Sequence, residues 1–362
     1  MNVAFIHGRP SPHPFHEALA RSVGAELMVV DPILRWNGLE VSPLRRYMSW
    51  LLCGLSFPKR NSYDLFMTEG GHATPIVMRM LGLLNDRQRT AALMANETFY
   101  FMKVGRYPQP TIDKLLWMFK RFDALLCMGS MQTRLAKELI TPVAPGVQIL
   151  TIRSCVQKDR ADAFSKVVPE LGGKNIVCIA NGPGGFRSWY KGIDLVFGAM
   201  EIALRTLPDL DLTIAGEWED TERQKLKTQF PNAFAHSTWL GQVKDVSLVL
   251  KSASLSIQMG RGDAYPIAIM ESQLAGVPVI ASEWTGSSEA VAQVEKAMVV
   301  PLEPEVAAVQ IIRYFRLSPD ERAELSRKGR EVAATYTEER AMCEFREAVD
   351  TVMNTPRKGR AG

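Results

Sequence analysis

The chain contains few cysteines, and none has the spacing of a metal site or a redox pair. Its five cysteines are scattered along 362 residues, with no C-x-x-C. An odd, dispersed set is typical of reduced, mostly buried thiols in a cytosolic protein, so we expect neither a disulfide framework nor a zinc site. No uninterrupted apolar run approaches the roughly 20 residues of a membrane span. The opening MNVAFIHGRP lacks a basic segment before a long apolar core, and it predicts a first strand instead of a signal peptide.

Two further absences limit the class of function. The glycine-rich segment NGPGGFRSWYKG (residues 181–192) has no G-x-G-x-x-G, and this argues against a dinucleotide-dependent oxidoreductase. The one Asp-x-Asp, Asp209 to Asp211, precedes a predicted strand. It therefore falls at the edge of the sheet opposite the edge where ligands bind. We expect no catalytic metal and no other cofactor.

The length and composition predict two soluble domains. A chain of 362 residues is too long for one ordinary core. Its apolar fraction of 46% and charged fraction of 23% are typical of a globular protein. We expect an N-terminal domain over residues 1–155 and a C-terminal domain over 156–335. Residues 336–362 are expected to form a helix that returns to the N-terminal domain, followed by a frayed tail.

Short β-rich runs alternate with helical patterns in both halves, which predicts an α/β fold with two parallel sheets flanked by helices. The expected strands are 2–7, 25–30, 63–68, 90–95, 123–128 and 147–152 in the first half, and 175–180, 211–215, 253–258, 277–281 and 297–300 in the second. The expected helices are 14–24, 73–84, 111–121 and 131–140, then 191–206, 219–228, 245–251, 266–275, 287–293, 319–334 and 338–353.

The stretch DAYPIAIME (residues 263–271) carries the strongest functional signal. Pro266 suits the first turn of a helix, and Gly276 suits the position just after its end. Asp263 is thus expected in the loop before the helix, and Glu271 more than one turn inside it. The free N–H groups of a helix start bind phosphate readily. The pattern therefore predicts a phosphate flanked by two carboxylates that accept hydrogen bonds from sugar hydroxyls.

Three loops are expected at the same edge of the second sheet, where ligands of an open α/β sheet bind. The first loop, after strand 175–180, brings Arg187 and Lys191 to the start of a helix. The second carries MGRGD, and the third carries SEWTGSSE. Basic residues, helix N-termini and carboxylates together suit an activated, anionic sugar.

These residues resemble the retaining GT-B glycosyltransferases, in particular family four (glycosyl transferases group 1). The resemblance rests on Asp263, Glu271 and AGVPVIAS, on Arg187 with Lys191-Gly192, and on Gly286 with Glu289. It covers roughly residues 175–300 well and is specific there. It implies two Rossmann-like domains that face a central cleft.

The resemblance also implies a role for each matching residue. Lys191 and Arg187 would neutralise the departing diphosphate, and Asp263 would hold hydroxyls of the donor sugar. Glu271 would bind the ribose, and the amides around Tyr265 and Ile267 would add a helix-terminus contact. Gly185 and Gly286 belong to the flanking glycine loops. The expected reaction moves a sugar from a nucleotide-diphosphate donor to a glycan or lipid-linked acceptor, with retention by a front-face mechanism.

The chain departs from the family pattern in two places. The first carboxylate is Asp263, where the family usually has Glu. After strand 90–95 the chain has Asn96 and Glu97, where the family often has a histidine. His7, His13 and His72 are other candidates, but no motif places them.

The net positive charge of residues 1–155 bears on which partners this part of the chain binds. Residues 1–155 carry 18 Lys and Arg against 11 Asp and Glu. This excess is either solvated surface charge or the mark of an anionic partner. Residues 45–60, RRYMSWLLCGLSFPKR, predict either a core helix with solvated ends or an amphipathic helix on an anionic membrane. We expect a cytoplasmic protein that binds no nucleic acid; under the second interpretation it is peripheral on the inner face of the membrane.

Two other functions fit the same residues. One is another GT-B enzyme, such as an epimerase or an inverting transferase, which the anomeric configuration of the product distinguishes. The other is a non-catalytic protein that binds nucleotide sugars.

Overall fold

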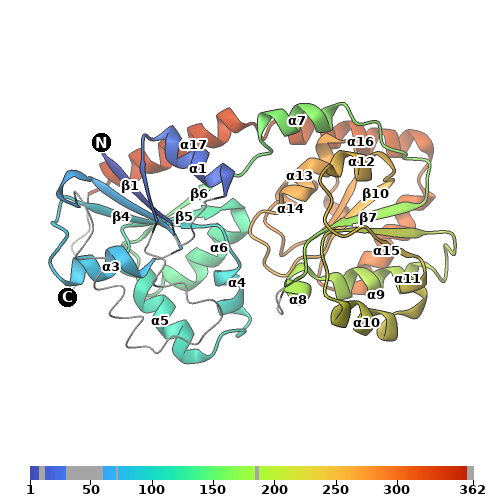
Figure 1. Ribbon diagram of the computed structural model, residues 1–362, viewed down its shortest axis with the longest axis horizontal. Helices are drawn as coiled ribbons and strands as arrows, with labels where there is room; N and C mark the ends of the chain where they lie inside the picture. The colour runs from blue at the N-terminus through green and yellow to red at the C-terminus, as the bar shows by residue number, and fades with distance from the viewer. Residues whose placement is uncertain (8–12, 30–59, 71, 184–186, 357–362) are drawn as a thin grey trace. The chain divides into compact units, whose positions relative to one another are not determined.

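The computed structural model describes residues 1–7, 13–29, 60–70, 72–183 and 187–356 (Figure 1). The chain forms two compact units. The N-terminal unit comprises Met1–Arg153 together with Glu339–Gly362, and the C-terminal unit comprises Ser154–Glu338.

The N-terminal unit contains a six-stranded parallel sheet in the order β2-β1-β3-β4-β5-β6. Its strands are β1 (Val3–His7), β2 (Glu26–Val29), β3 (Leu65–Glu69), β4 (Arg89–Met94), β5 (Ala124–Met128) and β6 (Gln148–Ile152). The helices are α1 (Pro14–Ser22), α3 (Ala73–Met80), α4 (Thr98–Lys103), α5 (Gln109–Phe119), α6 (Gly129–Ile140) and α17 (Glu338–Asn354), with a 3₁₀ turn at Arg60–Ser62. Strands β1 and β5 are buried along their whole length, as expected for a parallel sheet with both faces covered.

The C-terminal unit contains a second six-stranded parallel sheet, in the order β12-β11-β10-β7-β8-β9. Its strands are β7 (Asn175–Ile179), β8 (Asp211–Ala215), β9 (Ser237–Trp239), β10 (Leu255–Gln258), β11 (Val279–Ser282) and β12 (Val299–Val300). The helices are α7 (Lys158–Ser165), α8 (Arg187–Lys191), α9 (Ile193–Ala203), α10 (Asp220–Gln229), α11 (Pro231–Ala235), α12 (Val246–Lys251), α13 (Ile267–Leu274), α14 (Ser288–Val294), α15 (Pro304–Arg316) and α16 (Pro319–Ala334), with a 3₁₀ turn at Lys296–Met298.

The expected α/β class and all eleven expected strands are confirmed. The helix expected over residues 191–206 is α9, which begins at Ile193, whereas the short helix α8 before it is not predicted. Gly192 separates the two helices with a φ of 67°, a left-handed value that ends a helix and that glycine adopts without steric cost. The sequence patterns also do not predict β9 or the helices α4, α7, α11 and α15.

The core of the C-terminal unit lies between its sheet and its helices. Fully buried side chains include Val196 and Phe197 of α9, Ile257 of β10 and Ile311 of α15. In α15, the buried positions 307, 308, 311, 314 and 315 follow the helical period. The sheet is thus held rigidly, and the loops at its carboxyl edge start from fixed positions.

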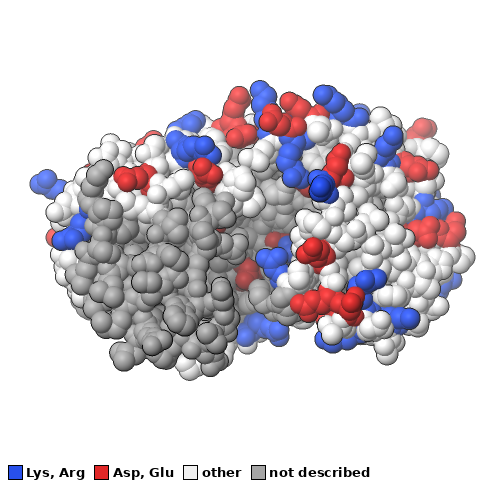
Figure 2. Space-filling model, in the orientation of Figure 1, with Lys and Arg blue, Asp and Glu red and all other residues white. Residues whose placement is uncertain are grey.

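Within the described ranges, every helix is too short or too polar to cross a bilayer. On the face of the C-terminal unit seen in Figure 2, basic and acidic side chains are interspersed among the described residues. Of the segment 45–60, only Arg60 is described, so the choice between its two interpretations stays open.

His72 is a half-buried titratable group beside α3. Its Nδ1 lies 2.8 Å from the Thr68 hydroxyl, and its ring meets Phe119 and Phe122 edge-on. Burial lowers the pKa of His72 from 6.5 to about 4, although the charge of Glu69 acts in the opposite direction. The folded protein therefore holds this imidazole neutral at pH values where the unfolded chain would protonate it.

We expect the stability to fall as pH decreases from 6.5 towards 4. In this window the unfolded state binds the His72 proton more readily than the folded state, so each pH unit costs up to roughly 1.4 kcal/mol of unfolding free energy. Urea unfolding at pH 7, 6 and 5 measures the slope. His72→Gln keeps a polar group opposite Thr68 but cannot titrate, so its curve should be flatter. Equal slopes for the two proteins would contradict this account.

Candidate active site

The loops that follow β7, β10 and β11 form the candidate site. These strands are neighbours in the order β11-β10-β7, and all run in the same direction. Their carboxyl ends therefore meet at one edge of the C-terminal sheet. This edge carries most of the site residues that the sequence predicts.

Helix α13 is fixed at both ends. Pro266 is its N-cap, and Gly276 follows it with a φ of 76°. The Gly276 N–H donates to the Gln273 carbonyl at 2.9 Å, and the Val277 N–H donates to the Ser272 carbonyl at 2.8 Å. This pair of bonds is a Schellman motif, which satisfies the last carbonyls of the helix.

The Arg330 side chain of α16 holds the C-terminal end of α13 from outside the loops. It donates hydrogen bonds to the Leu274 and Ala275 carbonyls at 2.6 and 2.8 Å. It also donates to the Ser165 and Val167 carbonyls, at and just after the end of α7, at 3.0 and 2.6 Å. Helices α7, α13 and α16 are thus tied together by one guanidinium.

The loops after β10 and β11 are joined through their main chains. The Gly262 N–H donates to the Trp284 carbonyl at 2.9 Å, and the Gly286 N–H donates to the Asp263 carbonyl at 2.8 Å. A Cβ on Gly286 would lie 1.5 Å from the Ala264 carbonyl oxygen, so glycine alone fits this close approach. The Asp263 backbone therefore has a fixed position.

The Asp263 carboxylate is nearly buried and has two partners. One oxygen accepts a hydrogen bond from Lys191 Nζ at 2.6 Å, and the other accepts one from the Tyr190 hydroxyl at 2.9 Å. The Lys191 side chain is 22% exposed and that of Asp263 is 12% exposed. A cation and a carboxylate are thus held together at the edge of the sheet, with part of each accessible.

The position of Lys191 follows from its surroundings. Gly192 lies so close to the next loop that a Cβ would meet the Met259 carbonyl oxygen at 1.9 Å. Arg261 donates to the Trp189 carbonyl at 2.6 Å and forms a bidentate pair with Asp194 at 2.7 Å. These contacts fix the short helix α8, and therefore Lys191, against the loop that carries Asp263.

Glu271 is buried within α13, where its side chain is 6% exposed and forms an ion pair with Arg160 of α7. Burial raises the pKa of Glu271 above its usual value, and the Arg160 guanidinium opposes that rise. A buried carboxylate with a single half-exposed cation can exchange that partner for another hydrogen-bond donor.

The structure brings together some of the predicted residues but not all. Lys191 contacts Asp263, and Gly286 bonds to its carbonyl. Glu271 pairs with Arg160 and not with these residues. Gly185 lies outside the described residues.

Arg187, Tyr265 and Ile267 occupy separate positions around this edge. Arg187 is exposed at the start of α8, and Ile267 is the first residue of α13. The Tyr265 hydroxyl donates to Glu289 Oε1 at 3.4 Å. The two ion pairs are therefore the best-defined features of the site.

The sequence patterns did not indicate Arg160, Tyr190 or Arg261 as site residues. Tyr190 and Arg261 stand inside the glycine-bearing segments that these patterns singled out, so their neighbourhood was a usable signal. Arg160 belongs to α7, which was not predicted, and only the packing of α7 beside α13 brings it to Glu271.

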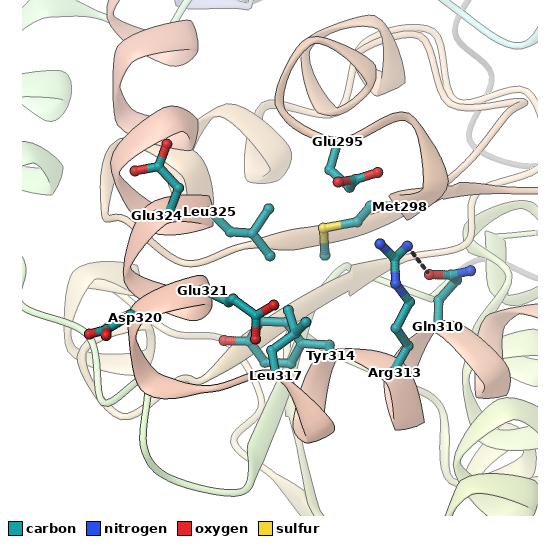
Figure 3. Close-up of a pocket in the computed structure, with 10 residues that line it drawn as sticks. All are labelled: Glu295, Met298, Gln310, Arg313, Tyr314, Leu317, Asp320, Glu321, Glu324 and Leu325. Atoms are coloured by element: carbon teal, nitrogen blue, oxygen red, sulfur yellow. Dashed lines mark hydrogen bonds between the residues drawn. The ribbon is translucent and has the colours of Figure 1, made fainter.

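A cavity of about 380 Å³ lies elsewhere in the C-terminal unit, between α15, α16 and the turn before β12 (Figure 3). Met298, Leu317 and Leu325 give it an apolar lining, whereas Glu321 and Glu324 are acidic. The Tyr314 hydroxyl donates to the Ser254 carbonyl at 2.5 Å. None of the predicted site residues lines this cavity.

Two six-stranded parallel sheets, each with helices on its faces, give this chain the GT-B fold. Residues 184–332, within the C-terminal unit, match the family model described as glycosyl transferases group 1. The match includes Lys191, Asp263, Glu271 and Gly286. No curated protein matches the chain in sequence.

Solved structures of three proteins illustrate the fold. HepE from Anabaena, in complex with UDP and glucose, is similar with a TM-score of 0.71 and 13% identity, over 97% of this chain and 100% of that chain. The trehalose-6-phosphate protein from E. coli, bound with UDP-2-fluoro glucose, has a TM-score of 0.71 and 12% identity, over 99% of this chain and 100% of that chain. Sucrose-phosphate synthase from Thermosynechococcus elongatus has a TM-score of 0.72 and 14% identity, over 97% of this chain and 99% of that chain.

We expect Gly286→Ala to destabilise the C-terminal unit by roughly 1–3 kcal/mol, because the added methyl would force the two loops apart. Gly172→Ala is the matched control, since no atom lies within 4 Å of a Cβ there. Its effect should stay within about 0.5 kcal/mol. Guanidinium unfolding of both variants measures the difference, and equal stabilities would show that the close approach at Gly286 is not a constraint.

Proposed function

We propose that this protein is a retaining glycosyltransferase that moves a sugar from a nucleotide-diphosphate donor to a hydroxyl of a glycan or lipid-linked acceptor. The observation that carries the proposal is the Lys191–Asp263 pair beside the start of α13, within the residues that match the glycosyl transferases group 1 model. A cation and helix N–H groups suit a diphosphate, and a carboxylate suits a sugar hydroxyl.

In this proposal the leaving diphosphate is the group that the site stabilises. Negative charge grows on it as the bond to the sugar breaks, and fixed donors aimed at that charge lower the barrier. Lys191 is the main donor, and Arg187 adds a second charge from the start of the same helix. The departing phosphate takes the acceptor proton, so no separate base is required.

Asp263 and Glu271 hold the two ends of the donor. Asp263 accepts hydrogen bonds from hydroxyls of the transferred sugar, while Lys191 turns towards the diphosphate. Glu271 accepts hydrogen bonds from the ribose, which replace its pair with Arg160. The amides around Tyr265 and Ile267 contact the phosphates between these positions.

We propose UDP as the first nucleotide to test. HepE was crystallised with UDP-glucose, and the E. coli trehalose-6-phosphate protein was bound with UDP-2-fluoro glucose. The fixed cations replace a metal at the diphosphate, so the proposed transfer continues in EDTA. A panel of nucleotide sugars in a thermal-shift assay identifies the donor, because specific binding stabilises the fold by mass action.

The anomeric configuration of the product tests retention. Proton NMR of the reaction should show the donor's anomeric configuration conserved in the first product formed. Inversion would identify an inverting GT-B enzyme. Donor binding without transfer or hydrolysis across the acceptor panel would indicate a non-catalytic binder instead.

We expect Lys191→Ala to lower kcat by about 100- to 1,000-fold, the usual effect of removing one fixed donor to a developing anion. Donor affinity should change much less, since the lost interaction is strongest in the transition state. The control is Lys225→Ala on α10, where the lysine side chain is 72% exposed. Near-normal turnover in the Lys191 variant would count heavily against the proposed mechanism.

We expect Glu271→Gln to weaken donor binding by at least roughly tenfold, because hydrogen bonds to a charged group contribute about 1.5–3 kcal/mol. Isothermal calorimetry with the nucleoside diphosphate alone measures this loss, since the ribose is present and the sugar is not. Glu305→Gln, at an exposed position in the first turn of α15, is the control. Unchanged affinity in the Glu271 variant would exclude a ribose contact.

A further inference from the structure

Two histidines and a glutamate meet at the carboxyl edge of the N-terminal sheet. His7 is the last residue of β1 and Glu69 the last residue of β3, and the parallel register pairs these two positions. His16 lies in the first turn of α1, the helix that follows β1. Elements from three parts of the sequence therefore bring three potential ligands together.

The side-chain atoms of this cluster converge closely. Glu69 Oε2 lies 2.5 Å from His7 Nε2, and Glu69 Oε1 lies 2.6 Å from His16 Nδ1. One ligand atom from each residue lies within 4.8 Å of the other two. The side chains of His7, His16 and Glu69 are 2%, 12% and 20% exposed. The cluster is therefore a nearly buried, polar group.

Other residues near the cluster have different roles. His13 Nδ1 accepts the Phe15 N–H and caps α1. His72 Nδ1 faces the Thr68 hydroxyl. His7, His16 and Glu69 are the described residues whose potential ligand atoms all lie within 4.8 Å of one another.

Two imidazole nitrogens and one carboxylate oxygen are a known ligand set for divalent transition metals. Zinc takes such a set at about 2.0–2.2 Å and keeps its fourth position open for water or substrate. Zinc binds nitrogen and oxygen ligands more tightly than iron(II) or manganese(II). We propose that His7, His16 and Glu69 bind one zinc-like divalent ion with an open coordination position.

The inference is independent of the proposed donor site, whose residues all belong to the C-terminal unit. The sequence predicts no metal site, because the spacing of these three residues along the chain gives no signal. Ligands at positions 7, 16 and 69 match no metal motif, and the strand register and the first turn of α1 are what bring them together.

The competing explanation is that Glu69 bridges the two histidine side chains and the cluster binds no metal. Zinc titration of the wild-type protein and of variants in the ligands distinguishes the two.

The experiment titrates the chelator-treated full-length protein with zinc chloride in a calorimeter at pH 7.5. The wild-type protein should bind one equivalent at this site. His16→Ala and Glu69→Gln should each lose at least roughly tenfold in affinity, since even outer-shell changes cost that much. Alanine is a good helix former, so the His16 variant should keep its fold, which circular dichroism verifies.

His236→Ala is the matched control, because this histidine lies in the C-terminal unit and its Nδ1 is 3.0 Å from the Leu210 carbonyl. It should bind zinc like the wild-type protein. Anomalous diffraction at the zinc edge should show a peak between the three ligands. No binding by the wild-type protein, wild-type affinity in both ligand variants, or a peak elsewhere would overturn the proposal.

Nucleotide-sugar binding is measured on the same chelator-treated protein, so that the metal site and the proposed function are tested separately. Loss of zinc binding with intact donor binding rejects only the metal site. Intact zinc binding without any donor response rejects only the proposed function.

Discussion

The hydrogen bond from the Gly286 N–H to the Asp263 carbonyl is the constraint on which the candidate site depends. It joins the loops after two neighbouring strands of the C-terminal sheet, and the absent side chain of Gly286 allows them to approach. The backbone of Asp263 is thereby held in place by main-chain contacts alone. Lys191 then has a carboxylate at a defined place, and α8 is held beside it by Arg261.

Both carboxylates of the site are buried, and each forms an ion pair with a cation whose side chain is partly exposed to solvent. Asp263 has the partly exposed Lys191, and Glu271 has the half-exposed Arg160. Removing a buried carboxylate from water is costly unless it is paired, so the ligand-free protein needs these cations. In the proposed function Lys191 turns to the diphosphate, while hydroxyls of the donor take the places of Lys191 and Arg160 on the two carboxylates.

Much of this architecture could be predicted from the sequence because it depends on local signals. Alternating apolar runs indicated two parallel sheets, and Pro266 with Gly276 bounded α13 closely. Lys191 and Asp263 were placed at one edge by strand direction alone. The signals failed where geometry depends on packing. They did not indicate the short helix α8, which the left-handed Gly192 separates from α9, and Arg160 reaches Glu271 only through the arrangement of α7 beside α13. The His7, His16 and Glu69 cluster likewise depends on strand register, which no local spacing records.

Arg330 couples two parts of the candidate site that are remote from it in sequence. Its one planar group holds the end of α7, which carries Arg160, and the end of α13, which carries Glu271. The relative position of the two helices that carry this ion pair is therefore set in part by Arg330. Lysine could not replace it, since a single ammonium lacks the forked geometry needed to span four carbonyls. The contact between Arg160 and Glu271 thus depends on a guanidinium that bonds to main-chain carbonyls at the ends of both helices.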